Sequence, residues 1–435
     1  MNYAEALTFI HSRPRLHRGH ELTWIKTFLA AIGHPEQQGR FIHITGTNGK
    51  GSVATMVTDM LLAAGLHVGR FISPYITRFN ERIQVDGKDI SDTDLAAATT
   101  HLADVLAGMQ AANPDFALTE FEFDTALGFY WFAQQQVDVA VIEVGIGGAH
   151  DKTNVIQPDV SAITTVGADH LELIGPTLAD VAREKAGVIK PQTPVVLGDI
   201  AAEQTQIITA AAQALAAPVA QLGRDFTVDH AHLHPADHAW QFDYHRGDQD
   251  WTKLRLPSIS AYEVRNAAVA ITVAQLYLHG RGKTLDQATA QAGLMAFRWP
   301  ARMELLHEQP YLMLDGAHNV PAAQALIKSI KAAFPGVTVH LIAAFLKDKD
   351  ATDMVRLYQR AGWLITATEF PDARILPVTD WPETTVPINH VANWQEALAV
   401  ALQAASADDL ILFAGSLHFV STVRNTLLKE DDREI

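Results

Sequence analysis

Residues 41–52 read FIHITGTNGKGS, and this stretch limits the folds that are open to the chain. It begins as a short apolar, β-prone run, turns at Gly46, Gly49 and Gly51, and then enters an apolar-periodic segment over 53–64. A strand, a glycine loop and a helix N-terminus in this order place backbone N–H groups around an anion. We therefore expect an α/β fold with a nucleotide site at this loop.

Two side chains of the loop strengthen this prediction. Lys50 supplies a charged donor for phosphate, and the Ser52 hydroxyl is suited to Mg²⁺. The strict Walker spacing is not met, because Gly49-Lys50 is followed by Gly51 and the position five before Gly49 is Ile44. The alternative is an ordinary glycine-rich turn, which would not require the lysine and the hydroxyl.

Length and composition describe a globular protein of two domains. The chain has 435 residues, more than one hydrophobic core usually supports, with a hydrophobic fraction of 48% and a charged fraction of 19%. It contains no cysteine, so any metal must be bound by oxygen or nitrogen ligands. We find no signal peptide and no apolar run of membrane-spanning length, and expect a cytoplasmic protein.

The net charge of the chain indicates which classes of partner it can bind. The net charge is −16, from 33 basic and 49 acidic residues, and no basic stripe is present. A nucleic-acid-binding protein would be expected to show one. We expect a monomer that binds small molecules and neither nucleic acid nor membrane.

Helical and strand-like patterns alternate along the chain, which favours the α/β class with mainly parallel sheets. An Arg-Trp-Pro turn at 298–300 marks a boundary. We expect residues 1–296 to form a P-loop-type ATPase domain with a mainly parallel sheet, and residues 297–435 a smaller Rossmann-like α/β domain. The histidine-rich stretch 224–257 lacks a helical period, so we predict a β-rich excursion with surface histidines there.

Polar side chains follow several predicted strands. Glu143 closes the apolar run 137–145 and resembles a carboxylate that holds Mg²⁺ beside a phosphate loop. His170 follows the run 160–167 and is either a metal ligand or a hydrogen-bonded, helix-capping histidine. Ser73 is equally a metal or phosphate contact or a plain turn serine.

The sequence allows more than one role for Lys185 and for the DGAHN motif (315–319). From its spacing, Lys185 is a solvated helix lysine or a phosphate contact. The aspartate and histidine of DGAHN follow a strand and open a helix, which could suggest hydrolysis. The chain has no G-x-S-x-G elbow, which argues against a hydrolase triad.

Together these motifs resemble the folylpolyglutamate synthase and dihydrofolate synthase family, relatives of the bacterial Mur ligases. The resemblance covers nearly the whole chain. In the family's order, the motifs are GTNGKGS (46–52), SPYITRFNERI (73–83), FEFDTAL (121–127), EVGIGG (143–148), TNVI (153–156), DHLELIG (169–175), EKAGVIKP (184–191), RWPARMEL (298–305), DGAHN (315–319), DKD (348–350) and GSLHFVSTVR (415–424).

The resemblance implies a Mur-ligase-like ATP- and folate-binding domain followed by a glutamate-ligase domain. The implied reaction moves the γ-phosphoryl group of ATP onto a folyl carboxylate, and the amino group of L-glutamate then displaces phosphate to form an amide. Phosphorylation gives a poor acyl donor a good leaving group. A lysine and two Mg²⁺ ions are expected to stabilise the charge on the transferring oxygens.

The resemblance also assigns roles to single residues. It implies that Lys50, Lys185, Asp315 and His318 act in catalysis. It implies ATP contacts from Thr47, Asn48, Gly49, Lys50, Gly51, Ser52, Asn266, Arg302 and Asp315. It implies metal ligation by Ser52, Ser73, Glu143, His170 and Lys185, the last as a carbamate, because an ammonium group cannot bind a cation. Phe121, Glu122, Tyr75 and Arg82 are expected on the folate side.

The chain departs from the family pattern at a few positions. Tyr75 stands where a histidine is common, and Ala149-His150 where the family usually has Arg-Leu. Ala261-Tyr262-Glu263 replaces a Gly-x-x-Gln pattern, and Ala301 and Val320 replace a glycine and a proline. Because the phosphate and metal set is whole, we expect an active enzyme with an altered acceptor pocket.

Three hypotheses follow. The first is a ligase that adds glutamate to a tetrahydrofolate or folylpolyglutamate. The second is the same chemistry with dihydropteroate as acceptor, or both activities in one chain. The third is a nucleotide-binding paralogue without ligase activity, which the departures suggest and the intact Lys50, Glu143, His170 and Lys185 oppose.

Overall fold

The computed structural model describes residues 1–14, 22–234, 238–347, 349–382, 384 and 386–431. Asp348 of the DKD motif lies outside them. The chain forms two compact units that do not follow a single cut in the sequence. The first unit comprises Met1–His230, Phe242–Leu256 and Arg265–Phe297; the second comprises Ala231–Gln241, Pro257–Val264 and Arg298–Ile435.

The first unit is built on an eight-stranded sheet with the order β4-β3-β2-β5-β1-β6-β7-β8. The strands from β2 to β8 in this order pair in parallel, and the pairs β2–β3 and β3–β4 are antiparallel. β1 and β5 are buried along their whole length, as expected of strands with helices on both faces. The bounds are β1 (Phe41–Thr45), β2 (Val68–Phe71), β3 (Ile83–Val85), β4 (Lys88–Asp89), β5 (Val139–Glu143), β6 (Val160–Ile163), β7 (Val195–Leu197) and β8 (Val219–Gln221).

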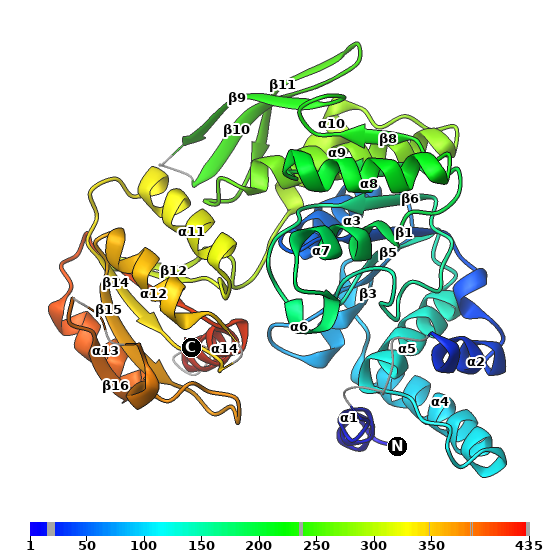
Figure 1. The fold of residues 1–435 in the computed structure, drawn as a ribbon, viewed down its shortest axis with the longest axis horizontal. Coiled ribbons are helices and arrows are strands. Elements are labelled where there is room, and N and C mark those ends of the chain that lie inside the picture. The colour runs from blue at the N-terminus through cyan, green and yellow to red at the C-terminus, as the bar shows by residue number, and fades with distance from the viewer. Residues whose placement is uncertain (15–21, 235–237, 348, 383, 385, 432–435) are drawn as a thin grey trace. The chain divides into compact units, whose positions relative to one another are not determined.

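Helices cover both faces of this sheet (Figure 1). They are α1 (Tyr3–His11), α2 (Thr23–Ala31), α3 (Lys50–Ala63), α4 (Asp92–Ala112), α5 (Glu120–Gln135), α6 (Leu171–Ile174), α7 (Leu178–Ala186), α8 (Ala202–Ala214), α9 (Glu263–Gly280) and α10 (Gln287–Ala296), with short 3₁₀ turns η1 (Pro35–Gln37) and η2 (Phe79–Arg82). Ser91, Thr119 and Thr177 cap α4, α5 and α7, because each side chain accepts the amide three residues on.

A separate three-stranded sheet has the order β11-β10-β9. Its strands are β9 (Thr227–His234), β10 (Ala239–Arg246) and β11 (Gln249–Leu256). The prediction of a β-rich excursion at 224–257 is confirmed. Its histidines are exposed or half-buried where the structure describes them, and Asp243 pairs with His230 at 2.8 Å.

The second unit holds a six-stranded sheet with the order β12-β13-β17-β14-β15-β16, parallel except for β12. The strands are β12 (Glu304–Glu308), β13 (Tyr311–Leu314), β14 (Val339–Ala343), β15 (Leu364–Glu369), β16 (Asn389–Asn393) and β17 (Leu410–Ala414). The helices are α11 (Val320–Ala333), α12 (Ala351–Arg360), α13 (Trp394–Ala404) and α14 (Leu417–Asp431), with the turn η3 (Val378–Asp380). The predicted α/β class, with a parallel-rich first sheet and a second α/β unit, is confirmed.

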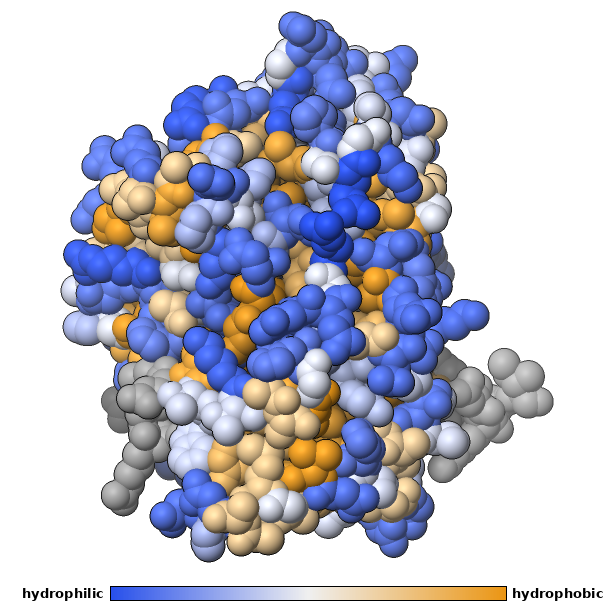
Figure 2. Space-filling model, turned by 90° about the vertical axis from the view of Figure 1, so that its right-hand side faces the viewer, coloured by the Kyte–Doolittle hydropathy of each residue, from blue (hydrophilic) through white to orange (hydrophobic). Residues whose placement is uncertain are grey.

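Figure 2 shows one face of the molecule, on which hydrophilic residues predominate and apolar residues are interspersed and gather at the lower end. In the part of the chain that the structure describes, no helix combines the length and the hydropathy needed to cross a membrane.

Candidate active site

Four neighbouring parallel strands bring the predicted site residues to one edge of the first sheet. In the order β2-β5-β1-β6 the carboxyl ends of the strands lie side by side. Ser73 follows β2, Glu143 ends β5, the glycine loop follows β1, and His170 lies in the segment after β6. Ligands of open parallel sheets bind at this edge.

The glycine loop needs glycine at two positions for different reasons. Gly49 is the N-cap of α3 and has a φ of 83°, in the left-handed region that favours glycine. A Cβ atom there would also lie 2.7 Å from Asn266 Oδ1 of α9. A Cβ atom on Gly46 would collide with the side chain of Thr164. The loop is therefore packed tightly between β6 and α9.

Threonines after β6 hold the loop, and sequence reasoning did not find them. The Thr164 hydroxyl donates to Asn48 O at 2.6 Å, and the Asn48 amide donates to the Thr165 hydroxyl at 2.9 Å. The Thr47 hydroxyl donates to Gly167 O at 3.1 Å and accepts the Gly167 amide at 2.9 Å. The only sequence signal was their position at a strand end beside the predicted metal segment.

Lys50 lies at the centre of the loop. Its ammonium group donates to Gly46 O at 2.9 Å and to Thr47 O at 3.3 Å. The first hydrogen bond of α3 runs from the Val53 amide to Gly49 O, so the amides of 50–52 lie at the positive end of the helix. Ser52 is buried in this first turn. The loop thus combines a positive charge, a helix N-terminus and a hydroxyl, which suits a phosphate chain.

Glu143 and Ser73 lie together. The buried Glu143 carboxylate accepts the Ser73 amide at 3.1 Å through Oε2. The Ser73 hydroxyl accepts a hydrogen bond from Arg82 Nη1 at 2.9 Å. This arrangement brings a carboxylate and a hydroxyl into the same small region, beside the phosphate-type loop.

Lys185 is buried near the end of α7, with 3% of its surface exposed. Burial, together with the positive charge of Lys50, lowers the pKa of its ammonium group to about 7. A lysine with such a pKa is partly neutral at neutral pH, and the neutral amine is nucleophilic. The interpretation of Lys185 as a solvated helix lysine is therefore wrong.

The turn after β5 packs directly on α7. The Ala149 amide donates to Glu184 O at 2.8 Å, and a Cβ atom on Gly148 would lie 2.6 Å from the same oxygen. Glu184 also accepts the His150 amide at 2.9 Å and pairs with His150 Nδ1 at 2.8 Å. These contacts hold the turn that follows Glu143 against the helix that carries Lys185, and so fix the two residues relative to one another.

His170 stands apart from this packed group. It is the N-cap residue of the short helix α6, with a φ of 51° and a third of its side chain exposed. Its ring nitrogens lie 3.9 Å from Asp169 Oδ1 and 3.7 Å from Glu172 Oε1. His170 is thus the N-cap residue of α6 by its backbone position, and its side chain makes no capping hydrogen bond to this helix.

The side chains gathered at this edge determine which metal ion the site could hold. Among the residues that the structure describes, no three His, Asp or Glu side chains are gathered closely enough to hold a metal ion by themselves. Glu143 and His170 would need oxygens from Ser73, from a modified Lys185 and from a phosphate. Hard oxygen ligands of this kind suit Mg²⁺, which keeps few protein ligands and shares substrate phosphates.

An aromatic wall lies next to Glu143. Phe121 packs on Phe71 with ring centroids 6.1 Å apart, and a Cβ atom on Gly145 would lie 2.7 Å from the Phe121 ring. Arg82 lies over the Tyr75 ring at 5.2 Å, so Tyr75 and Arg82 form one surface. The fourth residue expected here, Glu122, is instead buried: it accepts the Thr119 amide at 2.8 Å and pairs with Lys152 at 3.4 Å.

Asp124, which belongs to the FEFDTAL motif, lies near Arg82, and no role was predicted for it from the sequence. Its carboxyl group is 1% exposed, and neither oxygen has a hydrogen-bond partner among the described residues. Arg82 Nε lies 3.7 Å from Oδ2. Burial raises the Asp124 pKa to about 7, although the charge of Arg82 opposes this shift.

In the second unit, DGAHN follows β13 as predicted. Asp315 is buried and accepts the amides of Met303 at 2.9 Å and Ala317 at 2.8 Å. Burial raises the Asp315 pKa, and the charge of Arg302 opposes the rise. His318 Nδ1 lies 2.8 Å from Gly316 O. A Cβ atom on Gly316 would overlap the Arg302 guanidinium, so Arg302, Asp315 and His318 are neighbours.

Two models of Mur ligase domains match the chain. The Mur ligase middle domain matches residues 44–274, and the Mur ligase glutamate ligase domain matches residues 301–417. A folylpolyglutamate synthase of Lacticaseibacillus casei is 40% identical over an alignment of 438 positions, which covers 98% of this chain and 99% of that protein. The chain belongs to the folylpolyglutamate synthase family of Mur ligases.

Two further comparisons support this family membership. A dihydrofolate synthase/folylpolyglutamate synthase of Bacillus subtilis (strain 168) is 32% identical, over 98% of this chain and 99% of that protein. A solved FPGS–AMPPCP–folate complex has a TM-score of 0.88 and 40% identity, and the match covers 98% of this chain and 100% of that one. The predicted family is confirmed.

The structure accounts for one departure from the folylpolyglutamate synthase pattern. At 149–150, where the family usually has Arg-Leu, Ala149 lies against Gly187 and His150 pairs with Glu184. A Cβ atom on Gly187 would overlap Ala149, so the two small residues match.

Proposed function

We propose that this chain is an ATP-dependent amide ligase that adds L-glutamate to tetrahydrofolate or to a folylpolyglutamate. The observation that carries the proposal is the β1–α3 glycine loop around Lys50, in a chain 40% identical over 98% of its length to a folylpolyglutamate synthase. The solved relative in complex with AMPPCP and folate supports ATP and a folate as the ligands.

The reaction has two balanced steps. A carboxylate oxygen of the folate attacks the γ-phosphorus of ATP, the bond to the bridging oxygen breaks, and ADP leaves. The glutamate amine then attacks the acyl carbon of the acyl phosphate, loses a proton, and displaces inorganic phosphate as the amide forms. The activated carboxylate is the better acyl donor because phosphate is a good leaving group.

The residues of the first unit serve the first step. Lys50 and the amides at the start of α3 hold the phosphate chain and stabilise negative charge that develops on the transferring oxygens. Thr164 and Thr165 fix the loop so that these donors need no rearrangement during the reaction. Thr47, Asn48, Gly49, Gly51, Ser52 and Asn266 complete the proposed ATP contacts.

In the second unit, Arg302 is proposed to contact the nucleotide, and Asp315 and His318 to serve the transfer step. Their support is local: the Asp315 carboxylate is fixed by two backbone amides, and Arg302 and His318 lie beside it. A carboxylate held in this way keeps its orientation during binding.

The donor set fits two Mg²⁺ ions. Ser52, Ser73 and Glu143 would hold one ion, and His170 together with a carbamate on Lys185 would hold the second. Mg²⁺ supplies positive charge to the phosphate oxygens when bound. The neutral Lys185 amine can add CO₂ and lose a proton, and this supplies two carboxylate-like oxygens in a place where an ammonium group could not bind a cation. The buried position and the lowered pKa of Lys185 support this modification.

The acceptor is proposed to lie along Phe121, Tyr75 and Arg82. Their aromatic rings and guanidinium group suit a flat heterocycle. A second candidate function is ligation of glutamate to dihydropteroate, alone or in addition. The specific observation that favours it is the Bacillus subtilis relative, which is named for both activities.

The test is ADP release with ATP, Mg²⁺ and L-glutamate, with tetrahydrofolate, folylpolyglutamate or dihydropteroate as acceptor. We expect glutamate-dependent ADP with a reduced folate. Lys50→Ala is expected to lower kcat about 100-fold or more, because a preorganised charged donor is lost. Lys185→Ala should be similarly impaired and partly restored by short carboxylic acids.

Three results would count against these assignments. Absence of glutamate-dependent ADP with every acceptor would refute the ligase activity. Full turnover by Lys50→Ala would refute the role of the loop, and full turnover by Lys185→Ala would refute the carbamate. ADP release with dihydropteroate alone would leave the second candidate as the function.

A further inference from the structure

The segment 72–82 connects β2 to the turn before β3 and carries three proposed site residues, Ser73, Tyr75 and Arg82. Its two ends are tied together, because the Ile72 amide donates to Arg82 O at 3.0 Å and Arg82 Nη1 donates to the Ser73 hydroxyl at 2.9 Å. The position of Ser73 next to Glu143 therefore depends on what holds the rest of the segment.

Glu81 orders the middle of this segment. Its carboxylate accepts the amides of Ile76 at 2.7 Å, Thr77 at 2.8 Å and Arg78 at 3.0 Å. Hydrogen bonds to an ionised acceptor are about twice as strong as neutral ones. The three amides converge on one carboxylate. Glu81 directly follows Asn80 in the chain, so these hydrogen bonds depend on the position of Asn80.

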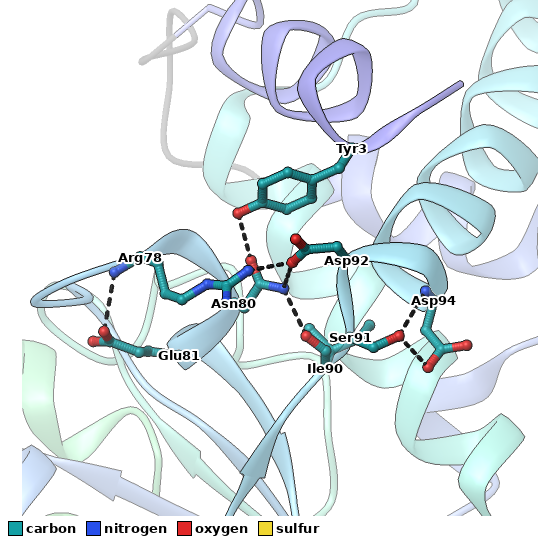
Figure 3. A network of polar contacts seen from close by, with 8 residues as sticks. All are labelled: Tyr3, Arg78, Asn80, Glu81, Ile90, Ser91, Asp92 and Asp94. Atoms are coloured by element: carbon teal, nitrogen blue, oxygen red, sulfur yellow. Dashed lines mark hydrogen bonds and ion pairs between the residues drawn. The ribbon is translucent and has the colours of Figure 1, made fainter. Parts of the chain in front are cut away.

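Asn80 ties the turn to two helices at a distance in sequence. Its side chain is buried, with 1% exposed, and uses its acceptor and both donors. Oδ1 accepts the Tyr3 hydroxyl of α1 at 2.7 Å, and Nδ2 donates to Ile90 O at 2.6 Å and to Asp92 Oδ1 at 3.1 Å. Figure 3 shows Asn80 between the Tyr3 ring and the start of α4, with Arg78 and Glu81 on the same turn.

The contacts around Asn80 differ in how strongly they hold the segment 72–82. Arg78 pairs with Asp92, and both side chains are about half exposed, so solvent weakens this pair. The Tyr3–Asn80 bond is partly buried, and the loss of its donor would take a partner from the buried Asn80 acceptor. It joins the N-terminal helix to the segment 72–82, together with the Arg78 guanidinium over the Tyr3 ring at 5.7 Å and the ring contact between His11 and Phe79 at 5.8 Å.

We propose that Asn80 and Tyr3 are positioning residues for the ligase, and that through them α1 sets the orientation of the segment that presents Ser73, Tyr75 and Arg82. This inference rests on the proposed function. Asn80 precedes Glu81 and stands two residues before Arg82, so a shift of Asn80 moves the guanidinium that holds Ser73 and covers Tyr75. The residues bind no substrate themselves.

The test compares Tyr3→Phe, which removes one hydroxyl and keeps the ring, with the unaltered protein. We expect KM for tetrahydrofolate to rise about five-fold, the equivalent of one neutral hydrogen bond, while kcat at saturation changes less than about two-fold. Asn80→Ala should raise KM further. Amide exchange at 76–78 should accelerate in Tyr3→Phe without any ligand.

The matched control is Glu5→Gln. Glu5 caps the same helix α1 by accepting the Asn2 amide at 2.8 Å, and it is not part of the network around Asn80. Glutamine can also accept this bond in a capping box, so the variant keeps α1 in place and should leave KM and the exchange at 76–78 unchanged. An equal rise in KM in both variants, or none in Tyr3→Phe, would overturn the proposal.

The two proposals fail in different ways. If the unaltered protein releases no glutamate-dependent ADP, the ligase function fails. The exchange comparison needs no turnover: unchanged exchange at 76–78 in Tyr3→Phe overturns the positioning role, and accelerated exchange confined to that variant supports it.

Discussion

At the scale of single residues, Asp124 is a buried acid held at a cost in stability. Among the described residues neither of its oxygens has a hydrogen-bond partner, and Arg82 Nε lies 3.7 Å from Oδ2. Burial outweighs the attraction to Arg82 and raises the Asp124 pKa well above its ordinary value, to about 7. The folded state binds a proton between about pH 4 and 7 that the unfolded state has released, so stability falls as the pH rises through this window.

Asp124→Asn should remove this pH dependence. We expect the variant to gain stability over the unaltered protein as the pH rises from about 4 to 7, with a difference of roughly 1–3 kcal/mol at pH 8. Urea unfolding at several pH values measures it. Asp104→Asn, an exposed change on α4, is the control and should show no such trend. A constant difference between Asp124→Asn and the unaltered protein would contradict this account.

The sequence located residues whose position follows from local pattern. Glu143 ends one apolar strand run, and Lys50 follows another across the glycine loop, so their place at the carboxyl edge of the sheet was predictable. Thr164 was not found, and no role was predicted for Asp124 or Asn80 although both lie in the quoted motifs FEFDTAL and SPYITRFNERI, because their contacts join separate segments of the chain. Thr164 contacts Asn48 across 116 positions, and single-sequence patterns carry no information on such pairs.

At the scale of elements, the end of α7 and the turn after β5 form one packed joint. Gly187 and Ala149 are in contact, and Gly148 lies against the backbone of Glu184. The joint holds Lys185 at a fixed place relative to Glu143. The sequence predicted α7 and β5 as separate elements, but the packing depends on small residues whose importance appears only when the two elements meet.

Gly187→Ala tests this joint. Gly187 has a φ of −62°, so alanine suits its backbone and any cost arises from overlap with Ala149. We expect a loss of about 1–3 kcal/mol in the free energy of unfolding and a fall in turnover. Gly108→Ala in α4, where a Cβ atom meets no neighbour, should instead stabilise by about 0.5–1 kcal/mol. Equal effects in the two variants would show that overlap does not matter.

At the scale of the whole molecule, two parallel-rich α/β units make up the chain. The alternation of strand and helix patterns predicted this class, because buried parallel strands and amphipathic helices have distinct periods. The patterns did not indicate that residues 231–241 and 257–264 cluster with the second unit, since membership of a compact unit depends on long-range contacts. Both units end their parallel strands in polar clusters, around Lys50 and around Asp315.

The central claim is that this family member joins glutamate to a folate through an acyl phosphate. The most direct measurement supplies a folate whose acceptor carboxylate carries ¹⁸O, and analyses the inorganic phosphate released with ATP and L-glutamate. Because the attacking carboxylate oxygen leaves with phosphate, we predict one ¹⁸O atom in phosphate for each glutamate added. Glutamate-dependent product with unlabelled phosphate would contradict the acyl phosphate route.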